Sequence, residues 1–285
     1  MAKYIGTYAS SGDVQTALNN QELSRPFIAY TTDNDKVYYG PAADKAEVGD
    51  IVVYSVADDL LHYIKQADYN TTSYPSASYV PVGVVSLPQN DDAILGPSGE
   101  ITFMGLNWLS KTSPDSGQST EQNIEWGCNK FDIPGLTNYS NSSTAITDMN
   151  GKANTEIVLQ YATAQTDWKT ASAITWVNEE GYYPLFECSW RYHTTGTSQG
   201  DWYVPACGQL YYLQSNSDEL TKLNAGFTSI GADLFEFQGK RRGASTEQSG
   251  TSAWYYNGSS WERAFKDYDI FFCARPYSSK LMTRI

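Results

Sequence analysis

Alternating apolar and polar positions predict strands in the first third of the chain. Residues 26–40, PFIAYTTDNDKVYYG, predict two short strands around an Asp-Asn-Asp turn. Residues 49–68 predict a hairpin with Asp58 and Asp59 at its turn, because apolar runs flank that acidic pair on both sides. Residues 79–88, YVPVGVVSLP, predict a third strand. This part of the chain is therefore expected to be β-structured.

Apolar residues at helical spacing occur once near the N-terminus and twice in the C-terminal part. The N-terminal segment predicts only a short helix, which must end before the proline at position 26. Residues 154–164 predict a helix with Asn154 as its cap. Residues 208–226 predict a second helical zone, in which Ser217 caps the later turns and Gly226 ends the helix.

Further strands are predicted by β-branched and aromatic runs between Gly- and Ser-rich stretches. These segments are residues 100–110, 122–136, 233–239, 252–258 and 268–277. Together with two helices, they predict an α+β fold that is mixed and strand-rich.

A Pro-, Gly- and acid-rich stretch at 88–100 suggests a linker before the C-terminal part of the chain. We expect an N-terminal arm with one short helix at 1–40 and a small β domain for attachment or oligomerisation at 41–97. A larger domain is expected at 98–285.

Charge and segment composition exclude some functions. The chain of 285 residues has a formal net charge of −13, which argues against nucleic acid as a partner because phosphate binding needs a basic face. No apolar run is long enough for a signal peptide or a membrane-spanning helix, so we expect no membrane insertion and no export by a signal.

Candidate groups for metal binding or catalysis are few. The four cysteines are widely spaced without a C-x-x-C pair, and buried reduced thiols are the simplest interpretation. A metal site at Cys188, His193 and Cys207 has no second close pair to support it. His62 lies in a predicted strand, where a packed ring is the simpler reading. We expect no cofactor, no metal and no catalytic residues.

Four segments of the C-terminal part occur in an order that resembles a known domain family. DMNGKANTEIVLQYA is followed by GDWYVPACGQLYYL, then by GASTEQSGTSAWYYN and finally by FFCARPYS. This order resembles the C-type lectin-like domains of gut-phage and bacterial surface proteins. The same fold occurs in the phage major tropism determinant and in other variable proteins of diversity-generating retroelements. The resemblance covers about 98–285 and implies that the end of the chain forms a ligand-facing surface.

The resemblance carries over to individual residues. It implies that Trp202 is a core residue, that Pro205 sets a helix entry and that Trp254 is buried. The family's pattern has other residues where this chain has Ala244 and Gln209. The EPN and WND triplets of calcium-dependent lectins are absent, so sugar binding through calcium is not implied.

The stretch 241–261 is expected to carry the ligand-binding residues. Tyr and Trp provide rigid contact area while Ser, Gly and Asn provide adaptable hydrogen bonds. The alternative is that Tyr255 or its neighbours belong to a strand core, since about half of a strand faces inward. The candidate ligand-binding residues are Arg241, Arg242, Ala244, Ser245, Glu247, Ser249, Tyr255, Asn257, Ser260 and Trp261.

These features suggest a non-catalytic phage virion protein that belongs to the tail or its fibres or decorates the capsid. Its expected partners are a host cell-surface protein or polysaccharide and, through residues 1–97, other virion proteins. A homo-oligomer is expected, with a trimer favoured by analogy. Two alternatives stay open: a purely structural virion protein, and an enzyme acting on surface polysaccharide, because 32 acidic residues leave a carboxylate pair conceivable.

Overall fold

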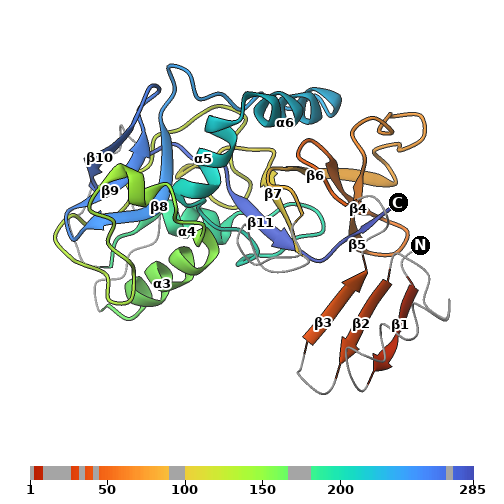
Figure 1. The fold of residues 1–285 in the computed structure, drawn as a ribbon, viewed down its shortest axis with the longest axis horizontal. Coiled ribbons are helices and arrows are strands. Elements are labelled where there is room, and N and C mark those ends of the chain that lie inside the picture. The colour runs from red at the N-terminus through yellow and green to blue at the C-terminus, as the bar shows by residue number, and fades with distance from the viewer. Residues whose placement is uncertain are drawn as a thin grey trace.

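A computed structural model describes residues 3–8, 27–31, 36–40, 45–89, 100–165, 181–267 and 272–285. These residues form three sheets and five helices (Figure 1), so the predicted α+β class is confirmed. The prediction of two helices is wrong, because the described residues contain α2 to α6. The helices are α2 Ser142–Ala145, α3 Gly151–Thr163, α4 Pro184–Arg191, α5 Cys207–Ser215 and α6 Ser217–Ser229.

The first sheet has three strands in the order β1-β2-β3. Strands β2 (Phe27–Thr31) and β3 (Lys36–Gly40) pair antiparallel, as the Asp-Asn-Asp turn predicted, and β1 (Lys3–Tyr8) pairs parallel with β2. The predicted N-terminal helix and most of the predicted linker lie outside the described residues.

The largest sheet has six strands in the order β11-β7-β6-β4-β5-β12. Strands β4 and β5 form the predicted hairpin, in which Asp59 adopts a positive φ of 59°. The sheet also crosses the predicted division at 97, since β6 on one side pairs with β7 on the other. That division is therefore not a break in the sheet. The six strands are β4 Ile51–Ser55, β5 Leu60–Ile64, β6 Tyr79–Val85, β7 Ile101–Gly105, β11 Tyr277–Lys280 and β12 Thr283–Arg284.

Both faces of the six-stranded sheet are covered by apolar side chains. On β4, Val52 belongs to one buried cluster while Ile51 and Val53 belong to another. Alternation along a strand places these residues on opposite faces. One cluster contains Trp202, as the resemblance implied, and the other contains Trp108. The chain thus builds two cores on either side of one sheet.

Helix ends differ from the predictions made for 154–164 and 208–226. Helix α3 begins at Gly151, so Asn154 lies inside it, where its side chain donates to Asp148 at 2.8 Å. The later zone forms two helices, of which α6 begins at Ser217 and continues past Gly226. A Cβ at Gly226 would lie 2.4 Å from the carbonyl oxygen of Gly49, so this glycine permits close packing rather than ending the helix.

Three of the predicted strands do not form regular β-ladders. Residues 122–136 and 233–239 have no strand assignment, and the described part of 268–277 joins a strand only at Tyr277. Single backbone hydrogen bonds hold these segments instead, such as Ile124 N–H to the carbonyl of Phe272 at 2.8 Å. Their apolar residues fill the cores without forming a regular edge.

Candidate functional site

The third sheet is built from the aromatic-rich stretch near the C-terminus. Its order is β10-β9-β8, with β8 at Arg242–Ser249, β9 at Ser252–Tyr256 and β10 at Trp261–Phe265. An Asn-Gly turn joins β9 to β10. The side-chain oxygen of Asn257 accepts from the N–H groups of Ser259 and Ser260, each at 2.8 Å, and Gly258 has a φ of +102°. This local turn chemistry fixes a regular antiparallel pair.

The middle strand β9 is buried on both faces. Trp254 and Tyr256 belong to the cluster around Trp108, whereas Ala253 and Tyr255 belong to the cluster around Trp202. Trp254 is 5% exposed and its indole N–H donates to the carbonyl of Tyr139 at 2.8 Å. Its predicted burial is confirmed. β9 is thus part of the core and offers no ligand surface.

A buried ion pair fastens β8 to the segment after β10. The carboxylate of Glu247 contacts the ammonium of Lys266, and both side chains have no exposed surface. Lys266 also donates to the carbonyl of Phe131 at 3.0 Å and lies 4.8 Å from the ring centre of Trp126. Burial raises the pKa of Glu247 to about 7 and lowers the pKa of Lys266.

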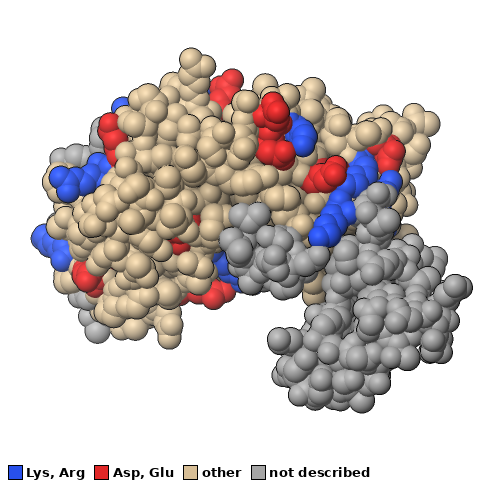
Figure 2. All heavy atoms as spheres, in the orientation of Figure 1, with Lys and Arg blue, Asp and Glu red and all other residues tan. Residues whose placement is uncertain are grey.

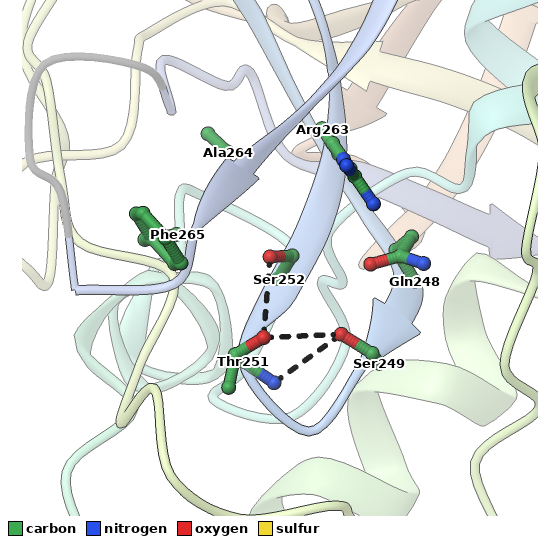
Figure 3. Close-up of a pocket in the computed structure, with 7 residues that line it drawn as sticks. All are labelled: Gln248, Ser249, Thr251, Ser252, Arg263, Ala264 and Phe265. Carbon is green, nitrogen blue, oxygen red and sulfur yellow. Dashed lines mark hydrogen bonds between the residues drawn. The ribbon is translucent and has the colours of Figure 1, made fainter.

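An open hollow of about 480 Å³ lies beside this ion pair, at the turn between β8 and β9 and against β10. We call it the hairpin hollow; Figure 3 shows its lining. The hydroxyls of Ser249 and Thr251 are 3.2 Å apart and those of Thr251 and Ser252 are 3.4 Å apart. Its lining residues are Gln248, Ser249, Thr251, Ser252, Arg263, Ala264 and Phe265.

Arg263 gives the hairpin hollow its charge. Its guanidinium extends toward Gln248 across the hollow (Figure 3), and it forms no ion pair with any residue that the structure describes. The adjacent Glu262 is paired across the strands with Tyr255, whose hydroxyl donates to it at 3.4 Å. None of the described residues that line the hollow carries a carboxylate. An acidic protein therefore has here a local site with positive charge.

The hollow can hold a polar ligand in two ways. Three hydroxyls and one amide can donate or accept hydrogen bonds, and the guanidinium can bind a carboxylate or phosphate in a bidentate manner. The ring of Phe265, in a residue that is 49% exposed, adds an apolar wall. This combination is suited to binding, because the polar groups converge on one concave surface.

Half of the predicted ligand-binding residues are buried, so their predicted exposure is wrong. Tyr255 lies between two packed layers, and Arg242 stacks on Trp108 with its Cζ 4.5 Å from the ring centre. Arg242 also donates to Glu121 at 2.9 Å. These side chains are used by the core. The buried members of the predicted set are Arg242, Ala244, Ser245, Glu247 and Tyr255.

The other predicted residues keep some exposure, but only one lines the hollow. That residue is Ser249. Sequence reasoning missed Arg263 and Phe265, although the pattern WERAF directly after an Asn-Gly turn is a signal of an exposed edge strand. The partly or fully exposed members of the predicted set are Arg241, Ser249, Asn257, Ser260 and Trp261.

The described residues offer little for metal or thiol chemistry. No group of three or more His, Cys, Asp or Glu side chains among them is placed to hold a metal ion. All four cysteines are buried and unpaired by disulfides, and burial raises the pKa of the Cys273 thiol to about 12. His62 is also buried, as expected for a packed ring in a strand, and one of its ring nitrogens lies 2.9 Å from Asp58.

The surface, the helices and the comparisons add three findings. Acidic and basic side chains are scattered singly or in small groups over the face in Figure 2. Within the described residues, no helix has the length and apolar character needed to cross a membrane. Comparison with protein-family models, with curated proteins and with solved structures finds no match.

Proposed function

We propose that this chain is a non-catalytic binding protein whose hairpin hollow holds an acidic group of a larger ligand. The observation that carries the proposal is the guanidinium of Arg263, which has no carboxylate partner among the described residues, extends toward Gln248 and lines the same hollow as three hydroxyls. A cation at such a position attracts anionic ligands and orients them.

The biological setting of the proposal rests on the resemblance to C-type lectin-like domains. In that setting the protein is displayed on a phage particle and contacts a host cell-surface protein or polysaccharide. Residues 1–97 attach the chain to other virion proteins, and a trimer multiplies weak contacts through avidity. Diversification by a retroelement belongs to the same proposal, and its check is whether natural copies of the gene vary around residues 241–262.

The ligand chemistry is tested with polygalacturonate as an acidic probe and dextran as a neutral one. Arg263→Gln removes the guanidinium, and Lys222→Gln on α6 removes one positive charge from an exposed position outside the hollow. Wild type is expected to bind polygalacturonate in titration calorimetry, more weakly at high salt. Arg263→Gln is expected to bind polygalacturonate about tenfold more weakly or worse, because a charge-assisted hydrogen bond contributes roughly 1.5–3 kcal/mol to binding.

The control variant shows whether a loss of binding comes from the hairpin hollow itself or from the change in the overall charge. Lys222→Gln has the same net charge as Arg263→Gln, so it is expected to bind like wild type. Equal losses in both variants would contradict a specific site at the hairpin hollow. Release of reducing sugar from the probe by wild type would contradict the non-catalytic role and favour the enzyme alternative.

A further inference from the structure

A second open hollow, of about 640 Å³, is lined by residues of α3 and α4 and shares no lining residue with the hairpin hollow. We call it the helix hollow. Among the described residues that line it, Leu159 and Trp190 are apolar and the others are polar or charged. Its size falls in the range of about 300–1,000 Å³ that is typical of ligand pockets.

Trp190 is the main aromatic surface of the helix hollow. The residue is 43% exposed, which is unusual for so large an apolar side chain in this molecule. Gly200, with a φ of +87°, packs beside the indole, and a Cβ there would lie 3.2 Å from Nε1. The N–H of Gly200 donates to the carbonyl of Trp190 at 2.8 Å. The ring is therefore supported from one side by backbone while much of it stays open.

Charged side chains beside the indole are already held in place. Arg191 Nε donates to Asp115 at 2.9 Å, and Arg191 Nη1 lies 3.7 Å from Glu187. The hydrogen bond from Arg191 lowers the pKa of Asp115 and raises the pKa of Arg191, so both stay charged at neutral pH. The hydrogen bond positions the two side chains, whose other atoms can still accept and donate hydrogen bonds.

Two amides complete the polar lining. The side chains of Gln160 and Gln199 form no hydrogen bond with other described residues, and both residues are exposed. The indole N–H of Trp190 likewise has no acceptor among the described residues. Each of these groups can therefore bind a ligand without first breaking an internal hydrogen bond.

The charge balance and shape favour one class of ligand. Asp115 and Glu187 outweigh the single guanidinium of Arg191, which disfavours phosphate and carboxylate ligands. Two apolar residues are too few to receive the apolar stripe of a helix. A neutral sugar ring has a face of C–H groups that matches an indole, and hydroxyls around its edge that match amides and a carboxylate.

We propose that the helix hollow binds a neutral saccharide, with a sugar ring stacked on Trp190. The interaction is separate from the acidic ligand of the hairpin hollow. It adds a second site on the same chain, so one polysaccharide with neutral and acidic units can engage both.

The test is an array of neutral oligosaccharides made of glucose, xylose, mannose or N-acetylglucosamine, followed by calorimetry with the best binder. Trp190→Ala is expected to bind at least tenfold more weakly, and Trp190→Phe is expected to keep part of the affinity because an aromatic face remains. Leu234→Ala is the matched control, since it removes another large apolar side chain that is 46% exposed but lies outside the hollow. Its binding is expected to equal that of wild type.

Other outcomes overturn the proposal. Absence of binding by wild type to every neutral oligosaccharide would do so, and so would equal binding by wild type and Trp190→Ala. If Trp190→Ala fails to fold, a Trp190→Phe affinity identical to wild type combined with full binding by Gln160→Ala and Gln199→Ala would also refute it. Arg263→Gln is expected to leave neutral saccharide binding unchanged, so failure here and failure of the hairpin proposal can be told apart.

Discussion

Strands β9 and β10 are neighbours in one hairpin, but only β10 presents side chains to solvent. Every residue of β9 is buried, whereas on β10 only Ala264 is buried. The two strands have similar aromatic content, with Trp254 on one and Trp261 on the other. The difference arises from what packs on each strand: β9 is the central strand with a core on each face, while β10 lies at one edge and has only Ala264 buried. Edge position alone does not expose a strand, because β8 at the other edge is buried at six of its eight residues.

This comparison teaches that aromatic content does not identify a binding surface. The alternation rule assumes one buried and one open face, and β9 has no open face. Strand β10, by contrast, keeps four of its five residues at least partly exposed and has no strand paired on its outer side among the described residues. The groups available to a ligand are therefore Arg263 and Phe265 on β10 rather than Tyr255 on β9.

The sharpest test of the comparison is the loss of a β9 side chain. Tyr255→Ala is expected to lower the free energy of unfolding by about 3–5 kcal/mol, because it leaves a cavity next to Phe272, whose ring centre is 6.1 Å away. Arg263→Ala on β10 is the matched control and is expected to change stability by less than about 0.5 kcal/mol. Urea unfolding followed by tryptophan fluorescence measures both. Equal effects would contradict the difference between the strands.

The buried ion pair predicts a pH dependence of stability. The folded-state pKa of Glu247 is raised to about 7 from an ordinary value of 4.5, so the folded state binds more protons between these values. Stability is therefore expected to fall as pH rises from about 4.5 to 7, by up to roughly 3 kcal/mol. In Glu247→Gln this fall should be absent. Urea unfolding at a series of pH values gives the two curves, and parallel curves would exclude Glu247 as the source.

Trp261 lies at the transition between the buried and exposed strands. Its ring contacts Tyr256 with centres 5.6 Å apart, and the residue is half-buried. Trp261→Ala is expected to lower the free energy of unfolding by about 1–2 kcal/mol, which lies between the effects expected for Tyr255→Ala and Arg263→Ala. Thermal unfolding measures the change. A cost as large as that of Tyr255→Ala would place Trp261 in the core rather than at its margin.

The smallest effect on stability is expected at Phe265. Because the residue is 49% exposed at the rim of the hairpin hollow, Phe265→Ser should change the free energy of unfolding by less than about 0.5 kcal/mol. Binding of an acidic ligand should weaken severalfold, since an apolar wall of the hollow is lost. A change in melting temperature without a change in binding would assign Phe265 to packing instead.

Local signals along the chain predicted much of the secondary structure. The Asp58-Asp59 turn, the strand at 79–88 and the strand at 252–258 depend on residues close in sequence. The helical zones at 154–164 and 208–226 were also predicted, but their ends were not, and α2 and α4 were missed. Asn154 looked like a cap, and its real role is a hydrogen bond to Asp148 and Ser245 within the folded core. Long-range partners override such local preferences.

The α+β class followed from composition and amphipathic pattern, and the resemblance to C-type lectin-like domains correctly implied the burial of Trp202 and Trp254. Which of the other aromatic residues stay exposed depends on the tertiary structure. Tyr255 is covered by Phe272, from a segment after its own hairpin, whereas Arg263 is exposed on β10. Exposure is a property of what packs from elsewhere in the chain, and periodicity within one strand does not contain that information.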